Sequence, residues 1–489
     1  MFRPLTRLGW ELLGLDCQRG IHAFDRALRD PQAAQTNHFQ SIMTHADGTA
    51  WARSYGLHAR SSIHEFRQRV PVQEPSELEP WTDRIRKGES HILTNTEIER
   101  LVPTSGTTGP SKLIPMTRAS RKEYSTAVKI WLGDCLRHCP AIKNGRAYLA
   151  TSPALDYQIE PGPVPVGFAR DSDYLGGIGR MVLGHILAVP ISVAGLREEA
   201  WRNTTRESLF RASDLSFVSL WHPSYWEALF SDEELTKLAD TWPQLKLIST
   251  WADGACQGAA RKLLKKFPKA AHASKGLWLT EGAVSVPWKG GCPVALLSGF
   301  SEFEDAYGNL FLAHELNQNQ NYRPILTNHA GLYRYRLGDL IRVDGSIHQT
   351  PSIRWIGRAD KVSDLRGEKI SDAQVALALQ QIIWRELFLL LPVEEADPPH
   401  YLCLVCEGSS TPFPVSKMEE ALKRNPHYAW AREVKQLGGL ALHHVPPDQI
   451  SEIKRTLDRK SNLHSKSTFI ITKDTSADLF RCLSAGVRN

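Results

Sequence analysis

Short β-rich runs alternate with helical patterns over about the first 360 residues of the chain, and this alternation restricts the fold more than any other feature. The β-rich runs lie at 146–155, 215–221, 245–254 and 275–288, and helical patterns lie at 197–213 and 256–268. Strands separated by helices are typical of layered α/β domains. We therefore predict a large layered α/β domain in the N-terminal part of the chain.

The predicted helices and strands of the C-terminal part are those of a smaller α+β unit. Capping-box helix starts are predicted at Ser371, with Gln374 three residues on, and at Ser416, with Glu419 three residues on. The runs 400–408 and 439–446 are predicted to be strands. Because 489 residues are too many for one small hydrophobic core, we predict two domains, 1–358 and 359–489.

The charge distribution disfavours nucleic acid and membrane as partners. Lys and Arg exceed Asp and Glu only by 59 to 53, and the basic residues occur in short runs typical of solvated helix faces. The apolar stretch 382–392 falls short of the roughly 18 residues of a membrane helix and is broken by Arg385 and Glu386. Glu11 and Asp16 interrupt the first apolar stretch, so we expect a cytoplasmic protein.

Cysteine usage gives little evidence for a disulfide framework or a metal centre. Eight cysteines are sparse and irregularly placed in a chain of this length. Cys403 and Cys406 have metal-like spacing, but no second Cys or His pair stands at zinc-finger distance. Residues three apart in a strand face opposite sides of the sheet, so we predict two buried thiols.

The segment 101–117, LVPTSGTTGPSKLIPMT, concentrates small hydroxyl residues and glycines in one loop. Gly106 and Gly109 allow the backbone close to an anion, and Lys112 adds a positive charge. The hydroxyls belong to Thr104, Ser105, Thr107 and Thr108. A phosphate cradle and a plain polar turn both fit this composition. The spacing of a Walker A loop is absent, and the GGIG at 176–179 is interpreted as a turn.

Three further stretches follow that loop in a recognisable order. Thr280 and Glu281 end a predicted strand in LWLTEG, Asp339 follows a glycine in YRYRLGDL, and WIGRADKVSDLRGEKIS begins at residue 355. Together they resemble the adenylate-forming (firefly-luciferase-like) superfamily. In detail, segments such as TSGTTGPSKLIPMT, KGLWLTEGAVSVPW and GLYRYRLGDLIRV resemble bacterial relatives of the plant auxin-induced Gretchen Hagen acyl acid amido synthetases. The resemblance extends from about residue 75 to the last predicted helix.

The resemblance implies an ATP- and Mg²⁺-dependent ligase. A carboxylic acid attacks the α-phosphorus of ATP, pyrophosphate leaves, and an amine such as that of an amino acid displaces AMP from the acyl adenylate. The implied nucleotide-binding residues are Thr104, Ser105, Gly106, Thr107, Thr108, Gly109, Lys112, Thr280, Glu281, Tyr335, Asp339 and Arg358. Lys112 would stabilise phosphate charge, Glu281 would hold Mg²⁺, and Asp339 would bind the ribose hydroxyls.

For several of these residues the sequence leaves a structural role open. Thr280 and Glu281 also fit a surface pair at a strand end, and Asp339 fits a capped turn. Asp360 and Lys361 lie where the superfamily has its hinge, about which the domain 359–489 rotates between half-reactions. A plain ion pair between those two side chains remains an alternative.

The acyl-acid pocket and the C-terminal catalytic lysine are assigned by resemblance. Tyr157, Trp221, Tyr225 and Trp226 would suit an aromatic or apolar acid, although aromatic residues in helices are more often core. Lys466, in a polar stretch before a strand-like run, is predicted to reach the site during adenylation. The rival lysines are Lys454, Lys460 and Lys473.

The expected partners are therefore two small-molecule substrates, a carboxylic acid and an amine. The protein itself is expected to be a monomer or a weak homodimer. Two other functions stay open. The acyl adenylate could pass to a thiol such as coenzyme A, or the chain could be a nucleotide-binding homologue without turnover. The presence of Lys112, Glu281 and Asp339 disfavours the second alternative.

Overall fold

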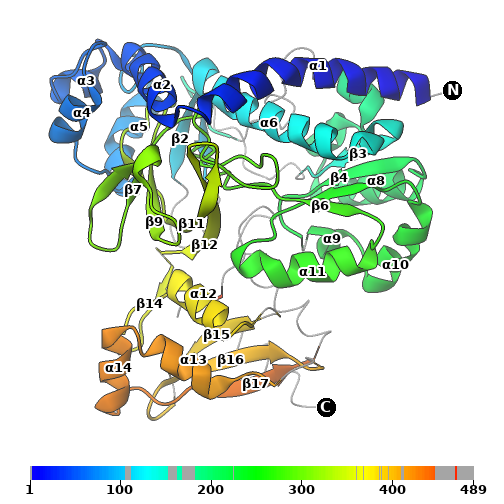
Figure 1. Cartoon of the computed structure of the whole chain (residues 1–489), viewed down its shortest axis with the longest axis vertical. Helices are drawn as coiled ribbons and strands as arrows, with labels where there is room; N and C mark the ends of the chain where they lie inside the picture. The colour runs from blue at the N-terminus through cyan, green and yellow to red at the C-terminus, as the bar shows by residue number, and fades with distance from the viewer. Residues whose placement is uncertain are drawn as a thin grey trace.

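The computed structural model describes residues 3–104, 112–151, 162–167, 182–223, 225–359, 361–366, 368–384, 386, 388–394, 396–408, 412–446 and 469–470. Within these residues no helix has the length and apolar character needed to cross a bilayer. Figure 1 shows the helices and strands gathered into an upper region that holds most of the chain and a smaller lower region that holds α12 to β17.

The N-terminal region begins with helices that cover one side of the molecule. They are α1 Arg3–Ala27, α2 Pro31–Ala46, α3 Ala50–Ser54, α4 Ile63–Arg69, α5 Glu79–Arg86 and, further on, α6 Arg118–His138. Helices α1 and α6 lie side by side (Figure 1). A Cβ on Gly133 of α6 would lie 2.2 Å from Cδ1 of Ile21 in α1, so only glycine permits this close approach.

A parallel sheet confirms the predicted α/β layering. Its strands are β3 Arg146–Leu149, β4 Leu215–Ser219, β5 Leu247–Ser249 and β6 Ala271–Ala273, in the order β3-β4-β5-β6. The accompanying helices are α8 Glu198–Phe210, α9 Tyr225–Leu229, α10 Asp232–Thr241 and α11 Gln257–Lys266. The β-rich run predicted at 275–288 instead forms only isolated bridges, such as Trp278 with Ala283.

A second, antiparallel sheet carries the Tyr-Arg-x-Gly-Asp motif. Its strands are β7 Phe300–Glu304, β8 Leu310–Leu312, β9 Asn321–Thr327, β10 Tyr335–Arg336, β11 Asp339–Ile347 and β12 Thr350–Arg358. A separate hairpin pairs β1 Ile98–Pro103 with β2 Leu113–Thr117. Short 3₁₀ turns are η1 Pro75–Leu78, η2 Pro140–Asn144, η4 Ile191–Gly195, η5 Gly254–Cys256 and η6 Ala313–Glu315.

The C-terminal elements enclose a hydrophobic cluster of their own, made of residues between Leu365 and Ile470. The strands are β13 Val362–Ser363, β14 Ile370–Ser371, β15 Phe388–Val393, β16 His400–Cys406 and β17 Ala441–Val445, and the helices are α12 Asp372–Gln381, α13 Val415–Leu422 and α14 Pro426–Glu433. Strand β16 lies between β15 and β17, antiparallel to the first and parallel to the second. Both predicted strands, 400–408 and 439–446, are thus confirmed.

One of the two predicted capping boxes is confirmed and the other is wrong. Ser371 caps α12, with its hydroxyl accepting from Gln374 N. Helix α13 begins earlier than predicted, after Pro414, and Ser416 lies inside it. The Glu419 carboxylate accepts instead from the Arg432 guanidinium and from Leu440 N. Tertiary contacts thus use the side chain that the local pattern assigned to the cap.

The two cysteines of β16 differ in burial, so the prediction of two buried thiols holds only for one. Cys403 is fully buried, whereas Cys406 is half-buried. Burial raises the pKa of the Cys403 thiol to about 12, so this sulfur stays protonated at neutral pH. A protonated core thiol contributes packing and no metal binding.

Candidate functional site

The loop rich in Ser, Thr and Gly connects the two strands of a tight hairpin. Pro103 pairs with Leu113, and Thr104 N donates to Lys112 O at 2.8 Å, so the ends of the loop are held together. Thr104 and Lys112 are both half-buried at this end. Ser105, Gly106, Thr107, Thr108 and Gly109 lie outside the described residues. The hairpin ends fix where this loop leaves and rejoins the fold.

Thr280 and Glu281 occupy the two central positions of a tight turn, not the end of a strand. Leu279 N donates to Gly282 O at 3.0 Å, and Gly282 N donates back to Leu279 O at 3.2 Å. Thr280 is exposed and Glu281 is half-buried. The backbone carbonyl of Glu281 accepts from Nδ2 of Asn328 at 2.6 Å. This bond fixes the turn to the segment between β9 and β10.

The turn Asn328–Gly331 joins three of the predicted motifs. Asn328 holds the Thr-Glu turn, as described, and Thr117 Oγ1, at the end of the hairpin, donates to His329 O at 3.0 Å. The chain then continues from Gly331 into β10, which begins at Tyr335. Tyr335 is buried and pairs with Leu326 of β9. Three segments far apart in sequence therefore meet at one turn.

Asp339 is the first residue of β11 and is almost completely buried. Its Oδ1 accepts from Trp355 Nε1 at 2.7 Å, and its Oδ2 lies 3.8 Å from Nη1 of Arg358. Asp339 and Arg358 face each other across the β11–β12 ladder. The structure thus brings together two residues that the sequence assigned to nucleotide binding. The sequence did not predict a role for Trp355, because no local sequence pattern indicates that its indole contacts a carboxylate sixteen residues away.

Beyond Arg358 the chain enters the predicted hinge, where Asp372 connects three segments. Its Oδ2 accepts from Arg358 N at 3.1 Å, and its Oδ1 accepts from Phe469 N at 2.5 Å and from Ile470 N at 3.2 Å. Lys361 O accepts from Asp372 N at 2.8 Å. Burial raises the pKa of Asp372, and the backbone donors oppose that rise. Asp360 lies outside the described residues.

Aromatic rings gather after the carboxyl end of β4, the edge of a parallel sheet where ligands usually bind. The Trp221 ring lies 5.6 Å from that of Trp251 and 6.0 Å from that of Trp278, between ring centroids. Lys275, which is buried, places Nζ 4.8 Å from the centroid of Trp221 and 2.5 Å from Ser219 Oγ. The predicted acyl residue Trp221 therefore lies beside a buried positive charge.

Tyr225 and Trp226 lie deeper, within a hydrophobic cluster of the parallel sheet. Tyr225 OH donates to Thr151 O at 2.8 Å and lies 2.7 Å from Tyr148 OH. The Trp226 ring stacks on Tyr148 with centroids 5.4 Å apart. Each is 1% exposed, so both side chains support the sheet that carries Trp221. Their assignment to the acyl pocket stays a prediction.

Several predicted residues lie outside the part of the chain that the structure describes. They are Tyr157, Lys466 and the rival lysines Lys454, Lys460 and Lys473, together with the GGIG segment at 176–179. Their roles stay predictions made from the sequence.

Comparison with known proteins identifies the class and then the family. The AtGH3.15 acyl acid amido synthetase, solved in complex with 2,4-DB, superposes with a TM-score of 0.80 over 96% of each chain, at 16% identity. A 2-hydroxyisobutyryl-CoA ligase in its postadenylation state superposes with a TM-score of 0.52 over 95% of this chain and 92% of that one, at 13% identity. The fold is therefore that of the adenylate-forming ligases.

Family models place the chain within this class. The GH3 family N-terminal domain matches residues 20–221 and the GH3 family central domain matches residues 296–358, together more than half of the chain. The jasmonoyl-L-amino acid synthetase JAR6 of Nicotiana attenuata is 24% identical over 88% of this chain and 89% of its own length. The chain belongs to the GH3 family of acyl acid amido synthetases.

Proposed function

We propose that this chain is an ATP-dependent ligase that activates a carboxylic acid as an acyl adenylate and transfers the acyl group to an amine, an amino acid in the first instance. The observation that carries the proposal is the turn Asn328–Gly331. It connects the phosphate-type hairpin, the Thr-Glu turn and the Tyr-Arg-x-Gly-Asp strand in a member of the GH3 family.

The chemistry needs charge stabilisation around a pentavalent phosphorus. A carboxylate oxygen attacks the α-phosphorus of ATP, the bond from that phosphorus to pyrophosphate breaks, and the carboxylate oxygen then bridges the acyl carbon and the AMP phosphorus. The amine then attacks that carbon, and AMP leaves with the former carboxylate oxygen. In this proposal Lys112, at the loop end of the hairpin, stabilises triphosphate charge, and Asp339 accepts hydrogen bonds from the ribose.

Mg²⁺ fits the Thr-Glu turn. Glu281 is half-buried, and the bond from Asn328 to its backbone carbonyl fixes the position of the turn. Its carboxylate is the acidic group of the turn and is the ligand that we propose for the ion. A single carboxylate together with substrate phosphates is a common arrangement for Mg²⁺. When bound, the ion supplies Lewis-acid stabilisation of the phosphate oxygens.

The remaining assignments belong to the same proposal. Lys466 is the mobile lysine of adenylation, Tyr157 and the aromatic residues Trp221, Tyr225 and Trp226 define the acyl-acid region, and the chain divides into a domain 1–358 and a mobile domain 359–489. The C-terminal hydrophobic cluster and the end of the central-domain match at residue 358 support that boundary. We also propose a bacterial, cytoplasmic enzyme that acts as a monomer or weak homodimer.

A panel of carboxylic acids tests the proposal. The purified chain is incubated with ATP, Mg²⁺ and each acid, with hydroxylamine as a surrogate amine, and pyrophosphate, ADP and hydroxamate are measured. Acid-dependent pyrophosphate release with hydroxamate formation is expected. Acid-dependent ADP and phosphate would mean an acyl phosphate and would overturn it. Paired amino-acid and coenzyme A acceptors then distinguish the amide product from the thioester alternative.

The Asp339→Asn variant is expected to raise the KM for ATP about 30-fold, because two hydrogen bonds from the ribose lose a charged acceptor, at roughly 1 kcal/mol each. Asparagine keeps an oxygen that accepts from Trp355 Nε1. Trp355→Phe is the matched control, since it removes the indole contact that Asp339→Asn retains and leaves the carboxylate in place. A KM for ATP that is unchanged in Asp339→Asn would show that the carboxylate does not bind the ribose.

A further inference from the structure

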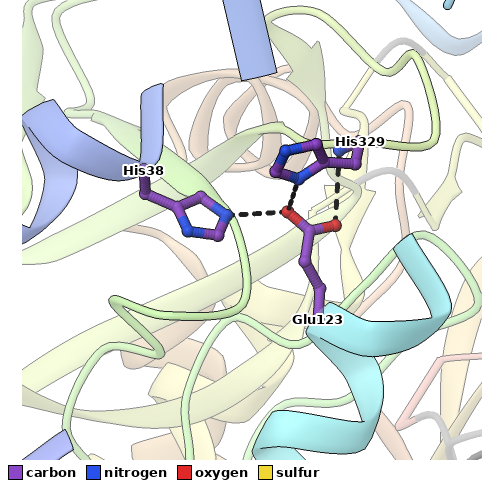
Figure 2. A group of neighbouring side chains, drawn as sticks. All are labelled: His38, Glu123 and His329. Carbon is purple, nitrogen blue, oxygen red and sulfur yellow. Dashed lines mark hydrogen bonds and ion pairs between the residues drawn. The ribbon is translucent and has the colours of Figure 1, made fainter. Parts of the chain in front are cut away.

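Two imidazoles and one carboxylate form a cluster at the turn Asn328–Gly331. None of the three residues is among those assigned to catalysis. His38 comes from α2, Glu123 from α6 and His329 from the turn itself (Figure 2). Glu123 Oε1 lies 2.7 Å from His38 Nε2 and 2.6 Å from His329 Nδ1. One ligand-type atom from each residue thus lies within 4.8 Å of the other two.

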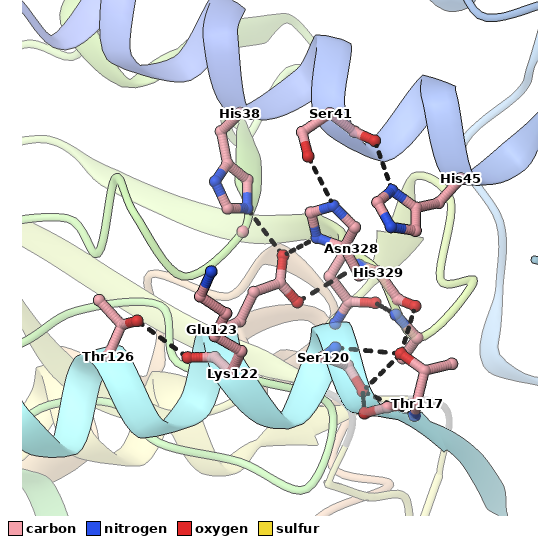
Figure 3. Close-up of polar contacts among 12 residues, drawn as sticks. His38, Ser41, His45, Thr117, Ser120, Lys122, Glu123, Thr126, Asn328 and His329 are labelled. Carbon is pink, nitrogen blue, oxygen red and sulfur yellow. Dashed lines mark hydrogen bonds and ion pairs between the residues drawn. The ribbon is translucent and has the colours of Figure 1, made fainter. Parts of the chain in front are cut away.

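Neighbouring groups orient the cluster. His329 Nε2 lies 3.0 Å from Ser41 Oγ, and His329 N donates to Glu123 Oε2 at 3.3 Å (Figure 3). The His45 ring packs edge-on against that of His329, with centroids 4.7 Å apart. These contacts engage the far nitrogen of His329 and the far oxygen of Glu123. His329 Nδ1 and His38 Nε2 both face the near oxygen of Glu123, Oε1.

Burial favours a specific ligand over loose binding at the surface. The side chains of Glu123 and His329 are each 7% exposed, and that of His38 is 14% exposed. All three side chains are therefore largely shielded from solvent, and His38 is the most exposed of them. A buried carboxylate needs compensation, which a cation or two imidazole N–H groups can supply.

We propose that His38 Nε2, Glu123 Oε1 and His329 Nδ1 form a binding site for one zinc-class divalent transition metal ion. Two imidazole nitrogens and one carboxylate oxygen are a donor set that zinc accepts, whereas Mg²⁺ prefers oxygen ligands throughout. A water molecule completes four-coordination. The site is chemically distinct from the Mg²⁺ position proposed at Glu281.

Metal binding requires a change in where the protons lie. Without metal, both ring nitrogens that face Glu123 Oε1 carry a proton and donate it to that oxygen. With metal, each presents a lone pair: His38 then carries its proton on Nδ1, and His329 carries its proton on Nε2, which donates to Ser41 Oγ. A hydrogen bond from the distal ring nitrogen of a metal-bound histidine orients the ligand and increases its basicity.

The site has a structural consequence for the Thr-Glu turn. His329 is next to Asn328, whose Nδ2 holds the Glu281 carbonyl. An ion that fixes His329 therefore also restricts the turn on which Asn328 lies. We expect the bound ion to stabilise the native state, because it binds the folded arrangement of three distant segments and not the unfolded chain.

Zinc titration of the chelator-treated full-length chain in competition with a chromophoric chelator tests the site directly. One equivalent of Zn²⁺ is expected to bind and to raise the midpoint of thermal unfolding. His38→Ala and Glu123→Gln should each weaken binding by at least about 100-fold, since even outer-shell substitutions cost 10–100-fold. His138→Ala is the matched control, because His138 also pairs with a carboxylate, that of Asp134 at 3.2 Å, but is itself exposed and has no third ligand-type group in that pair.

The outcomes separate the alternatives. Unchanged stoichiometry and affinity in His38→Ala would place the zinc elsewhere and overturn the site. No binding by the wild-type chain would show that the three side chains form only a hydrogen-bonded network, which also overturns it. Because His38 is the most exposed of the three side chains, we expect its replacement to disturb folding least. Circular dichroism of each metal-free variant checks that the fold is retained. Because binding is measured without acid or ATP, failure here leaves the ligase proposal untouched.

Discussion

Replacement of Glu281 by glutamine is expected to slow acid-dependent pyrophosphate release by about 100-fold or more, a loss of roughly 2.7 kcal/mol of transition-state stabilisation. Glutamine retains the size of the side chain, and the bond from Asn328 reaches the backbone carbonyl, so the turn should keep its shape. Only the charge that would hold Mg²⁺ is removed. Initial rates measured across a Mg²⁺ titration should show both a lower maximum and a higher half-saturating concentration.

Glu207→Gln serves as the matched control for this variant. Glu207 is an exposed helix carboxylate paired with Arg211, and its neutralisation should leave the Mg²⁺ dependence unchanged. If Glu281→Gln kept the wild-type rate and Mg²⁺ dependence, Glu281 would be a structural turn residue. The metal position in the proposed site would then be wrong.

The Arg334→Met variant is expected to lose up to about 3–5 kcal/mol of unfolding free energy, because it leaves the buried Glu302 carboxylate with Arg67 alone, whose Nε lies 3.1 Å from Oε1. Arg334 Nε and Nη2 donate to the two oxygens of Glu302 at 2.9 and 3.0 Å, and both side chains are at most 3% exposed. Arg334 Nη1 also donates to Val70 O at 2.6 Å. Urea unfolding followed by tryptophan fluorescence measures the loss.

Two further variants separate charge burial from simple loss of packing. Arg354→Met removes an exposed partner of Asp344 and should cost less than about 1 kcal/mol. Adding Glu302→Leu to Arg334→Met should recover part of the stability, since the buried carboxylate is removed and Arg67, its other partner, is 29% exposed and can be solvated. A double variant as unstable as the sum of the two single variants would show that the ion pair itself adds nothing.

The sequence predicted those parts of the fold that depend on local pattern. The α/β alternation, the cap at Ser371 and the strands 400–406 and 441–445 follow from periodicity and capping chemistry within a few residues. The helix that begins after Ser371 ends at Gln381, and Ile383 has a positive φ of 58° that a helix cannot contain. Such an interruption depends on tertiary packing and carries no strong local signal.

In the candidate site, too, only the features that depend on local sequence were predicted. The motif loops were found because glycine, hydroxyl and acidic residues lie close together in sequence. The contacts that assemble them were missed, because their partners are far apart: Asn328 lies 47 residues from Glu281, and Glu123 lies 206 residues from His329. No spacing rule connects residues at such separations.

Isotope transfer from the acid to AMP tests the central claim most directly. The acid that supports pyrophosphate release is supplied with both carboxyl oxygens labelled with ¹⁸O, together with ATP, Mg²⁺ and an amino acid, and the products are analysed by mass spectrometry. The acyl-adenylate route predicts AMP that carries one ¹⁸O atom and an amide that retains the other. Labelled inorganic phosphate with unlabelled nucleotide would contradict it, because the acid would then have attacked the γ-phosphorus.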